Sequence, residues 1–236
     1  MPAEHPTNRV LAALSRADLL HWQPHLERVE LNTQHTLQTP DAPIEFVHFP
    51  VGALVGLVHV ARHGAVEAPV ALVGNDGVLG MTPLLGVEVE RMRAVVLHPG
   101  SAWRLPIAAL PKLPLQGSVV LHVVSRYLQT LNVQMAQTAL CRLSHTVPQR
   151  LCRWLLDAFD RVPGEALDID VAELGAWLDA DSDAVREAAS QLVAAGVIER
   201  QTGRTLLRDR AALANCACSC HALVKHQVEQ MFPPAF

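Results

Sequence analysis

Residues 115–143 are the longest stretch with helical character in the chain, and after Gly117 they contain neither proline nor glycine. Pro106, Pro111 and Pro114 come shortly before this stretch. Proline and glycine both weaken helices, so their absence here predicts one long helix that separates an N-terminal part of the chain from a C-terminal part.

Apolar side chains recur along this helix at alternating spacings of three and four, which places them on one side. They are Leu121, Val124, Leu128, Leu131 and Met135. We predict that this stripe is the seam of a homodimer, in which the long helices of two copies pair. The alternative is that the stripe packs against the β-domain of its own chain.

Residues 1–114 are predicted to form a sensor domain with an antiparallel β-roll, or jelly roll. One or two short helices are expected between Asn8 and Leu26, with Ser15 and Asp18 as caps. Turn residues such as the stretch 74–77 then separate short runs of β-forming residues. The runs are Val29–Leu31, Glu45–Phe49, Ala53–Val60, Val66–Val73 and Arg93–Leu97.

Residues 144–236 are predicted to form a winged helix-turn-helix with a helical tail. Helical patterns are followed by two β-type runs that turn at Gly203. The helical patterns cover Val147–Phe159, Val171–Leu178 and Ser182–Ala195. The predicted fold class is therefore α+β, with a β-roll, a dimerisation helix over 115–143 and a winged helix-turn-helix.

The composition excludes several classes of protein. Half of the residues are hydrophobic, which suffices for a sizeable core, and the formal net charge of −4 gives no global basic field for nucleic acid or an anionic membrane. No apolar run approaches the roughly 20 residues of a membrane span, and the N-terminus has no export signal, so we expect a cytoplasmic protein. No catalytic constellation is recognisable, and we predict that the chain is not an enzyme.

The order of these parts resembles the Crp/Fnr family of bacterial transcription regulators. Residues 73–80 resemble the glycine-bounded turn of the family's ligand pocket, and residues 93–96 resemble the strand that follows it. Residues 146–156 resemble the helix that opens the family's DNA-binding domain. The resemblance implies a homodimer that senses a small molecule or redox signal in the β-roll and reads a palindromic DNA site.

The resemblance also implies a set of pocket residues, but it does not favour cyclic AMP. Family members that bind cyclic nucleotides carry a carboxylate after the glycine turn and an arginine two residues before an alanine; here Met81 and Met92 stand at these places. We predict no cofactor and an unknown effector other than cyclic AMP, with a vestigial β-roll as the alternative. The pocket residues carried over are Gly74, Gly77, Gly80, Met81, Arg91 and Arg93.

Metal sensing is not the favoured interpretation either. The N-terminal region has no cysteine, which excludes an iron–sulfur cluster there, and its scattered histidines do not favour haem. A cluster near the C-terminus has good zinc ligands, Cys216, Cys218, Cys220 and His221, but its spacing is closer than in most structural zinc sites. We predict no metal; a metal or thiol switch is the alternative. In a continuous helix Cys216 and Cys220 would share a face and Cys218 would point away.

The resemblance assigns DNA binding to an unusually acidic helix. The implied contact residues are Ser182, Arg186, Arg200 and Arg204. Residues 166–210 carry nine acidic and five basic side chains, so the whole deficit of four charges lies in this module. Carboxylates repel phosphate, which makes ordinary DNA readout unfavourable. The alternative is a relative that does not bind DNA, whose acidic winged helix binds a protein partner or whose β-roll senses a ligand.

Overall fold

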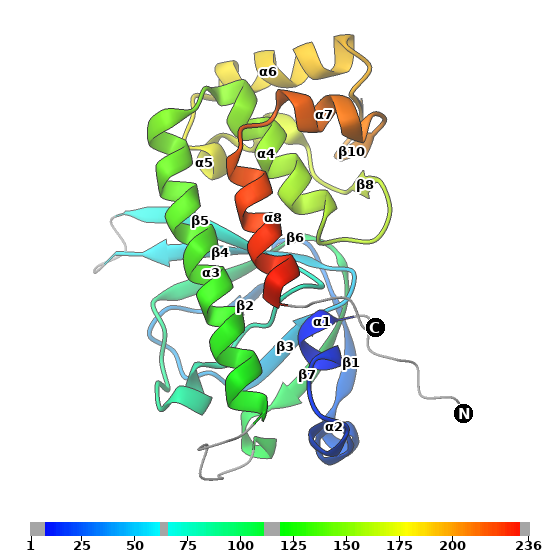
Figure 1. The fold of residues 1–236 in the computed structure, drawn as a ribbon. Helices are drawn as coiled ribbons and strands as arrows, with labels where there is room; N and C mark the ends of the chain where they lie inside the picture. Colours follow the sequence, from blue (N-terminus) through cyan, green and yellow to red (C-terminus); the bar gives the residue numbers. More distant parts are fainter. Residues whose placement is uncertain (1–7, 62–65, 111–118, 232–236) are drawn as a thin grey trace.

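The computed structural model describes residues 8–61, 66–110 and 119–231. Within these ranges an N-terminal β-roll is followed by a long helix and a C-terminal helical domain with a small sheet (Figure 1). This order confirms the predicted α+β architecture. The predicted turn at 62–64 and the first residues of the predicted long helix, 115–118, lie outside the described residues, so the boundary between the first two predicted domains stays a prediction.

Two antiparallel sheets form the β-roll, with strand orders β1-β7-β3 and β2-β6-β4-β5. Small and β-branched side chains, such as Val55 and Val96, fill the core that the two sheets share. Each predicted strand run is present, whereas the sequence does not predict β2, which is very short, or β7, in which Trp103 and Arg104 interrupt the pattern. The strands are β1 (Glu27–Leu31), β2 (Thr36–Gln38), β3 (Phe46–Pro50), β4 (Leu54–Val60), β5 (Glu67–Val73), β6 (Met92–His98) and β7 (Gly100–Pro106).

Short helices surround the β-roll, and their caps are local. The Asn8 side chain accepts hydrogen bonds from two amides of α1, and Ser15 caps α2 by accepting from the Asp18 amide, as the sequence predicts. These helices are α1 (Arg9–Ala12) and α2 (Arg16–Trp22), with the 3₁₀ segments η1 (Gln23–His25), η3 (Thr82–Leu85) and η4 (Ile107–Ala109).

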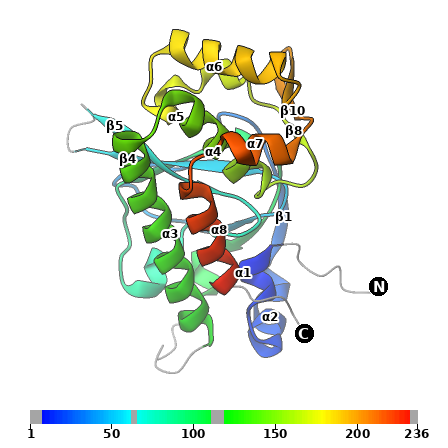
Figure 2. The same cartoon turned by 45° about the horizontal axis from the view of Figure 1, so that its top comes forward.

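The long helix α3 (Val119–Ser144) runs along the β-roll, and the C-terminal helix α8 (Cys220–Met231) lies beside it (Figures 1 and 2). The two helices are antiparallel. Near one end of α8 the Thr130 hydroxyl is 3.1 Å from the Met231 sulfur, and near the other the Gln137 amide is 3.1 Å from the Cys220 sulfur. The far C-terminal chain therefore returns along the helix that connects the two domains. Among the described residues, no helix combines the length and apolarity needed to cross a membrane.

The C-terminal domain begins with α4, whose first turn carries a capping box formed by Thr146 and Gln149. Its small sheet has the strand order β8-β10-β9. The helical and hairpin segments agree closely with the prediction. The elements are α4 (Val147–Phe159), β8 (Ala166–Leu167), η5 (Val171–Glu173), α5 (Gly175–Leu178), α6 (Ser182–Ala194), β9 (Ile198–Gln201), β10 (Arg204–Leu207) and α7 (Arg210–Cys216).

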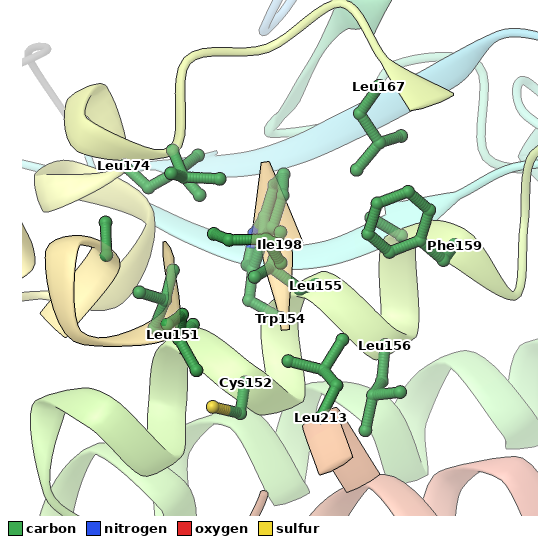
Figure 3. Packing of buried hydrophobic residues seen from close by; sticks show 14 of the residues in the cluster. Leu151, Cys152, Trp154, Leu155, Leu156, Phe159, Leu167, Leu174, Ile198 and Leu213 are labelled. Atoms are coloured by element: carbon green, nitrogen blue, oxygen red, sulfur yellow. The ribbon is translucent and has the colours of Figure 1, made fainter. Parts of the chain in front are cut away.

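One apolar core joins this domain to the β-roll. Figure 3 shows side chains of α4 converging with Leu174, Ile198 and Leu213 from the surrounding elements. The same cluster includes Leu54 of β4 and Leu72 of β5, which are almost fully buried. The C-terminal domain is therefore docked on the β-roll by shared apolar packing.

Candidate functional site

A helix-turn-helix is formed by α5, a short turn and α6 at the far end of the molecule from α2 (Figure 1). Asp179, where the related pattern has glycine, adopts a left-handed φ of 52°, which aspartate tolerates better than most residues. The Asp181 side chain caps α6 by accepting from the Asp183 amide at 2.8 Å. Arg150 of α4 donates to the carbonyls of Leu178 and Asp179 and so holds the turn.

The helix α6 has one buried and one exposed face. Its apolar face enters the core with Val185, Ala188, Ala189 and Leu192. Ser182 and Arg186, which were predicted to contact DNA, are exposed, and so is Glu187. Ser182 is the first helical residue and Asp181 is the cap, so Ser182 lies at the exposed N-terminus of the helix.

Each arginine assigned to DNA contact is already paired with an aspartate of its own domain. Arg186 forms an ion pair with Asp183 one turn earlier on α6. On the wing, which is the hairpin of β9 and β10, Arg204 lies 2.9 Å from Asp168. Arg200 likewise lies 2.9 Å from Asp170. Sequence reasoning found the charge deficit but missed this one-to-one pairing, because two of the three pairs join residues about thirty or more positions apart.

Two of these pairs are largely exposed, and the third, between Arg200 and Asp170, is about one-third exposed. Arg186 and Asp183 have exposed side-chain fractions of 56% and 87%, and Arg204 and Asp168 have 48% and 43%. Exposed ion pairs typically contribute about 0–1 kcal/mol, so a phosphate can replace the carboxylate at little cost in stability. The arginines are thus available, but each carries a competing anion.

The pocket residues implied by the resemblance do not converge. Met81 is 4% exposed and packs in the apolar cluster that includes Val124 and Tyr127 of α3. Arg93 pairs with Glu67, and both side chains are more than one-third exposed. Arg91 lies 3.8 Å from Asp41, also at the surface. Both arginines are thus paired with carboxylates at the surface, whereas Met81 lies in an apolar cluster.

The glycine turn instead contacts the C-terminal domain. A Cβ atom on Gly74 would lie 2.5 Å from the Arg161 carbonyl oxygen, so the close approach requires glycine. The Asn75 amide donates to that carbonyl at 3.1 Å, and Arg161 Nε lies 3.1 Å from Asp76 Oδ2. We call these contacts the interdomain latch: Gly74, Asn75 and Asp76 on the β-roll, and Arg161 after α4.

A second contact joins the helix-turn-helix to the β-roll. The Trp177 ring of α5 lies over Gly56 of β4, where a Cβ atom would come within 1.9 Å of the ring. Only glycine leaves room for the indole there. The helix that precedes α6 is therefore positioned by a strand of the β-roll.

The predicted seam residues of α3 face their own chain in this structure. Val124 has no exposed surface, and Leu128 and Leu131 pack against the same apolar cluster of the β-roll. Met135 packs against the core between the sheets, and Leu121 is partly buried. These placements are those of the intrachain alternative, and a role of the stripe in dimerisation stays a prediction.

The C-terminal cysteines do not lie in a continuous helix. The chain leaves the helical conformation between α7 and α8, where Ala217 is extended. Cys216 is exposed and interacts with Cys152, and His221 Nε2 lies 2.8 Å from Asp160 Oδ2. Cys218 and Cys220 point instead toward the end of α3. The four residues singled out in the sequence are thus divided between three different surroundings.

His48 of β3 borders a cavity of about 270 Å³ that Gly80 also lines. Burial, together with the positive charge of Arg104, lowers the pKa of His48 from 6.5 to about 4. Below pH 6.5 the unfolded chain binds a proton that the folded chain does not, so the folded state loses stability as the pH falls from about 6.5 to about 4.

We expect His48→Leu to remove this part of the acid sensitivity, on the order of 2 kcal/mol. Urea unfolding at pH 7 and pH 4.5 measures it: the wild type should lose more stability between the two values than the variant. His59→Gln, at an exposed position of β4, serves as the control. Equal losses for wild type and His48→Leu would contradict the assignment.

Residues 149–216 match the family model described as the Crp-like helix-turn-helix domain. This stretch of the chain is therefore similar to the helix-turn-helix domain of Crp. The match covers α5, α6 and the wing, and it confirms the family resemblance seen in the sequence. No curated protein matches the sequence.

Solved structures support the same assignment for the whole fold. FixK2 from Bradyrhizobium japonicum is 19% identical, with a TM-score of 0.66 over 82% of this chain and 98% of that chain. A transcriptional regulator of the CRP/FNR family from Thermus thermophilus, TTHA1359, is 20% identical, with a TM-score of 0.62 over 80% and 97%. The c-di-GMP responsive regulator CLP from Xanthomonas campestris is 15% identical, with a TM-score of 0.61 over 83% and 100%. At these identities the likeness concerns the fold.

Proposed function

We propose that this chain is a homodimeric, cytoplasmic transcription regulator that binds DNA through α6 and its wing. The observation that carries the proposal is the exposed face of α6 beside the wing, held by a correctly formed turn in a domain that matches the Crp-like helix-turn-helix. A helix presented in this way enters the major groove, and the flanking arginines bind phosphates.

The DNA interface of this regulator is an exchange interface. On binding, each of Arg186, Arg200 and Arg204 leaves its aspartate for a phosphate, so part of the electrostatic gain offsets the lost pair and the released carboxylate repels DNA. The consequence is a weaker affinity and a smaller salt dependence than three free arginines would give. The regulator then occupies only operator sequences whose base contacts supply the remaining affinity.

We further propose that the effector is not cyclic AMP. A buried cyclic phosphate needs a cation and amide donors, whereas Met81 is buried among apolar side chains and both candidate arginines are paired at the surface. The cavity beside His48 and Gly80 is the place where we would first look for a different effector. Cyclic AMP should leave DNA binding unchanged.

Selection of bound fragments from random-sequence and genomic DNA, at low and physiological salt, tests the proposal. We expect enrichment of a palindromic site, and we expect the triple change of Arg186, Arg200 and Arg204 to Ala to weaken binding on the order of tenfold or more and flatten its salt dependence. Arg91→Ala and Arg93→Ala, on the β-roll, are the matched controls.

A second candidate function is suggested by the charge of the same surface. With every assigned arginine paired, the module keeps a net charge of −4 over residues 166–210, which suits a basic protein partner. The DNA experiment separates the two. Absence of binding at low salt would remove the DNA proposal and leave the protein partner as the function to pursue.

We propose that a second copy contacts the part of α3 that its own chain leaves uncovered. Ala136, Ala139, Leu140 and Leu143 are exposed there, and the exposed fractions of the two leucines are 51% and 87%. Small residues allow two helices to approach closely, and the leucines supply apolar area. The fully buried Val124 takes no part in this contact.

Leu143→Lys is expected to convert the dimer into a monomer, because it places a charge in an apolar contact between two copies. Light scattering coupled to gel filtration gives the mass. Leu223→Lys on α8, where Leu223 is 54% exposed, controls for the loss of an exposed leucine. An unchanged dimeric mass for Leu143→Lys would show that the dimer contact does not involve this part of α3.

A further inference from the structure

Four soft ligand atoms from two distant parts of the chain meet at the end of α3. They belong to Cys141, His145, Cys218 and Cys220, and all four lie within 4.8 Å of one another. The three cysteines are 2%, 7% and 1% exposed and form an apolar cluster of their own. Three thiols and one imidazole are one of the donor sets of structural zinc sites.

The backbone explains how the ligands converge. Cys141 and His145 are four residues apart at the C-terminal end of α3, so their side chains project from the same side of the helix. Cys218 lies in the break between α7 and α8, after the extended Ala217, and Cys220 is the first residue of α8, so both sulfurs can face the end of α3. The close spacing that is unfavourable for a metal site within a helix is therefore suitable here.

The distances fit one tetrahedral ion. Cys141 Sγ lies 3.5 Å from Cys218 Sγ, and Cys220 Sγ lies 3.6 Å from His145 Nδ1. Zinc bonds of about 2.3 Å to sulfur and about 2.0–2.1 Å to nitrogen give ligand separations of about 3.8 Å for two sulfurs and about 3.6 Å for sulfur and nitrogen in a tetrahedron. The 3.5 Å between sulfurs is far longer than a disulfide bond, and both cysteines are free thiols.

From this geometry we infer that Cys141, His145, Cys218 and Cys220 form a mononuclear Cys₃His site for Zn²⁺. Binding releases the three thiol protons to solvent, because thiolates are the ligands, and no oxidant or reductant takes part. The Gln137 amide nitrogen, 3.1 Å from Cys220 Sγ, donates a hydrogen bond that helps to hold a thiolate in place.

The site would act as a clamp between distant segments. It ties the segment between α7 and α8 to the C-terminal end of α3, where the chain passes from α3 to α4. Because α8 packs along α3, with Arg126 donating to the Gln230 carbonyl at 2.6 Å, a bound ion would fix the whole C-terminal return of the chain. This inference concerns the metal site alone and stands whether or not the chain binds DNA.

The test is to measure zinc in the full-length protein, and then to remove the metal with a chelator and titrate Co²⁺ into the reduced apoprotein. We expect about one zinc per chain, and with cobalt the intense visible absorption and thiolate charge-transfer band of a tetrahedral sulfur site. Cys141→Ser and Cys218→Ser should abolish retention of the metal. Cys216→Ser and His221→Gln, which lie outside the site, should keep it and are the matched controls.

The wild-type cobalt titration does not depend on how well any variant folds. A metal-free protein that gives no tetrahedral cobalt spectrum would overturn the inference. A Cys141–Cys218 disulfide in the purified protein would also overturn it, if the protein takes up no metal after the disulfide is reduced. The absorption of an iron–sulfur cluster, or an equal loss of metal from the Cys216→Ser control, would do the same.

Discussion

Replacement of Asp168, Asp170 and Asp183 by Asn is expected to raise the affinity of the chain for DNA, on the order of 10- to 100-fold at low salt. Each aspartate now neutralises one arginine of the proposed interface. The amide keeps the size of the side chain, and in Asp170 it preserves the oxygen that caps η5. Three freed arginines should also steepen the salt dependence, because more counterions leave the DNA on binding.

A control with the same change in charge decides whether pairing or net charge is responsible. Asp41, Glu27 and Glu67 pair with arginines on the β-roll, away from α6. Their conversion to Asn and Gln adds the same charge and breaks the same number of surface pairs. Electrophoretic shifts over a salt series measure both proteins. An equal gain in DNA affinity from the β-roll variant would show that overall charge causes the effect, and it would contradict the exchange interface.

Replacement of Arg161 by Met is expected to lower the free energy of unfolding by about 3–5 kcal/mol. The Arg161 side chain is 5% exposed and lies 3.1 Å from Asp76 and 3.9 Å from Asp157, and these two carboxylates are about as well buried. Removal of the guanidinium leaves Asp76 in a poorly solvated place without its cation, whereas Asp157 keeps Arg153, whose Nε lies 3.3 Å from Asp157 Oδ2. Urea unfolding followed by circular dichroism gives the difference.

An exposed pair provides the comparison for this loss. Arg208 lies 2.6 Å from Glu199, and both side chains are about half exposed, so Arg208→Met should have little effect on the free energy of unfolding. Addition of Asp76→Asn to Arg161→Met should recover part of the stability, since it removes the carboxylate that Arg161→Met leaves without its cation. If Arg161→Met costs no more than Arg208→Met, the latch contributes nothing to stability.

Local signals explain why so much of the secondary structure was predictable. The Thr146 to Gln149 capping box and the prolines define the ends of α3 and α4, and Gly196 follows the end of α6 in the left-handed region. The alternation of β-forming residues similarly indicates β3 to β6. These signals involve residues within a few positions of one another.

The site could not be predicted in the same way, because its contacts join distant segments. The helical stripe on α3 looked suited to a second copy or to the β-roll, and only the fold shows Val124 enclosed by its own chain. Cys218 meets Cys141, 77 residues away, and His221 next to the cluster turns to Asp160. These contacts, and the pairing of Arg204 with Asp168, depend on how helices and strands that are distant in the sequence pack against one another.

The core shared by the two halves of the chain has a consequence for attempts to divide the protein. Leu54 and Leu72 of the β-roll complete the apolar cluster of the C-terminal domain, and Trp177 covers Gly56. A fragment that begins near residue 144 would expose this apolar surface and aggregate. Heat or denaturant should melt both halves together in one transition, so the unit of folding in this chain is larger than either of its recognisable modules.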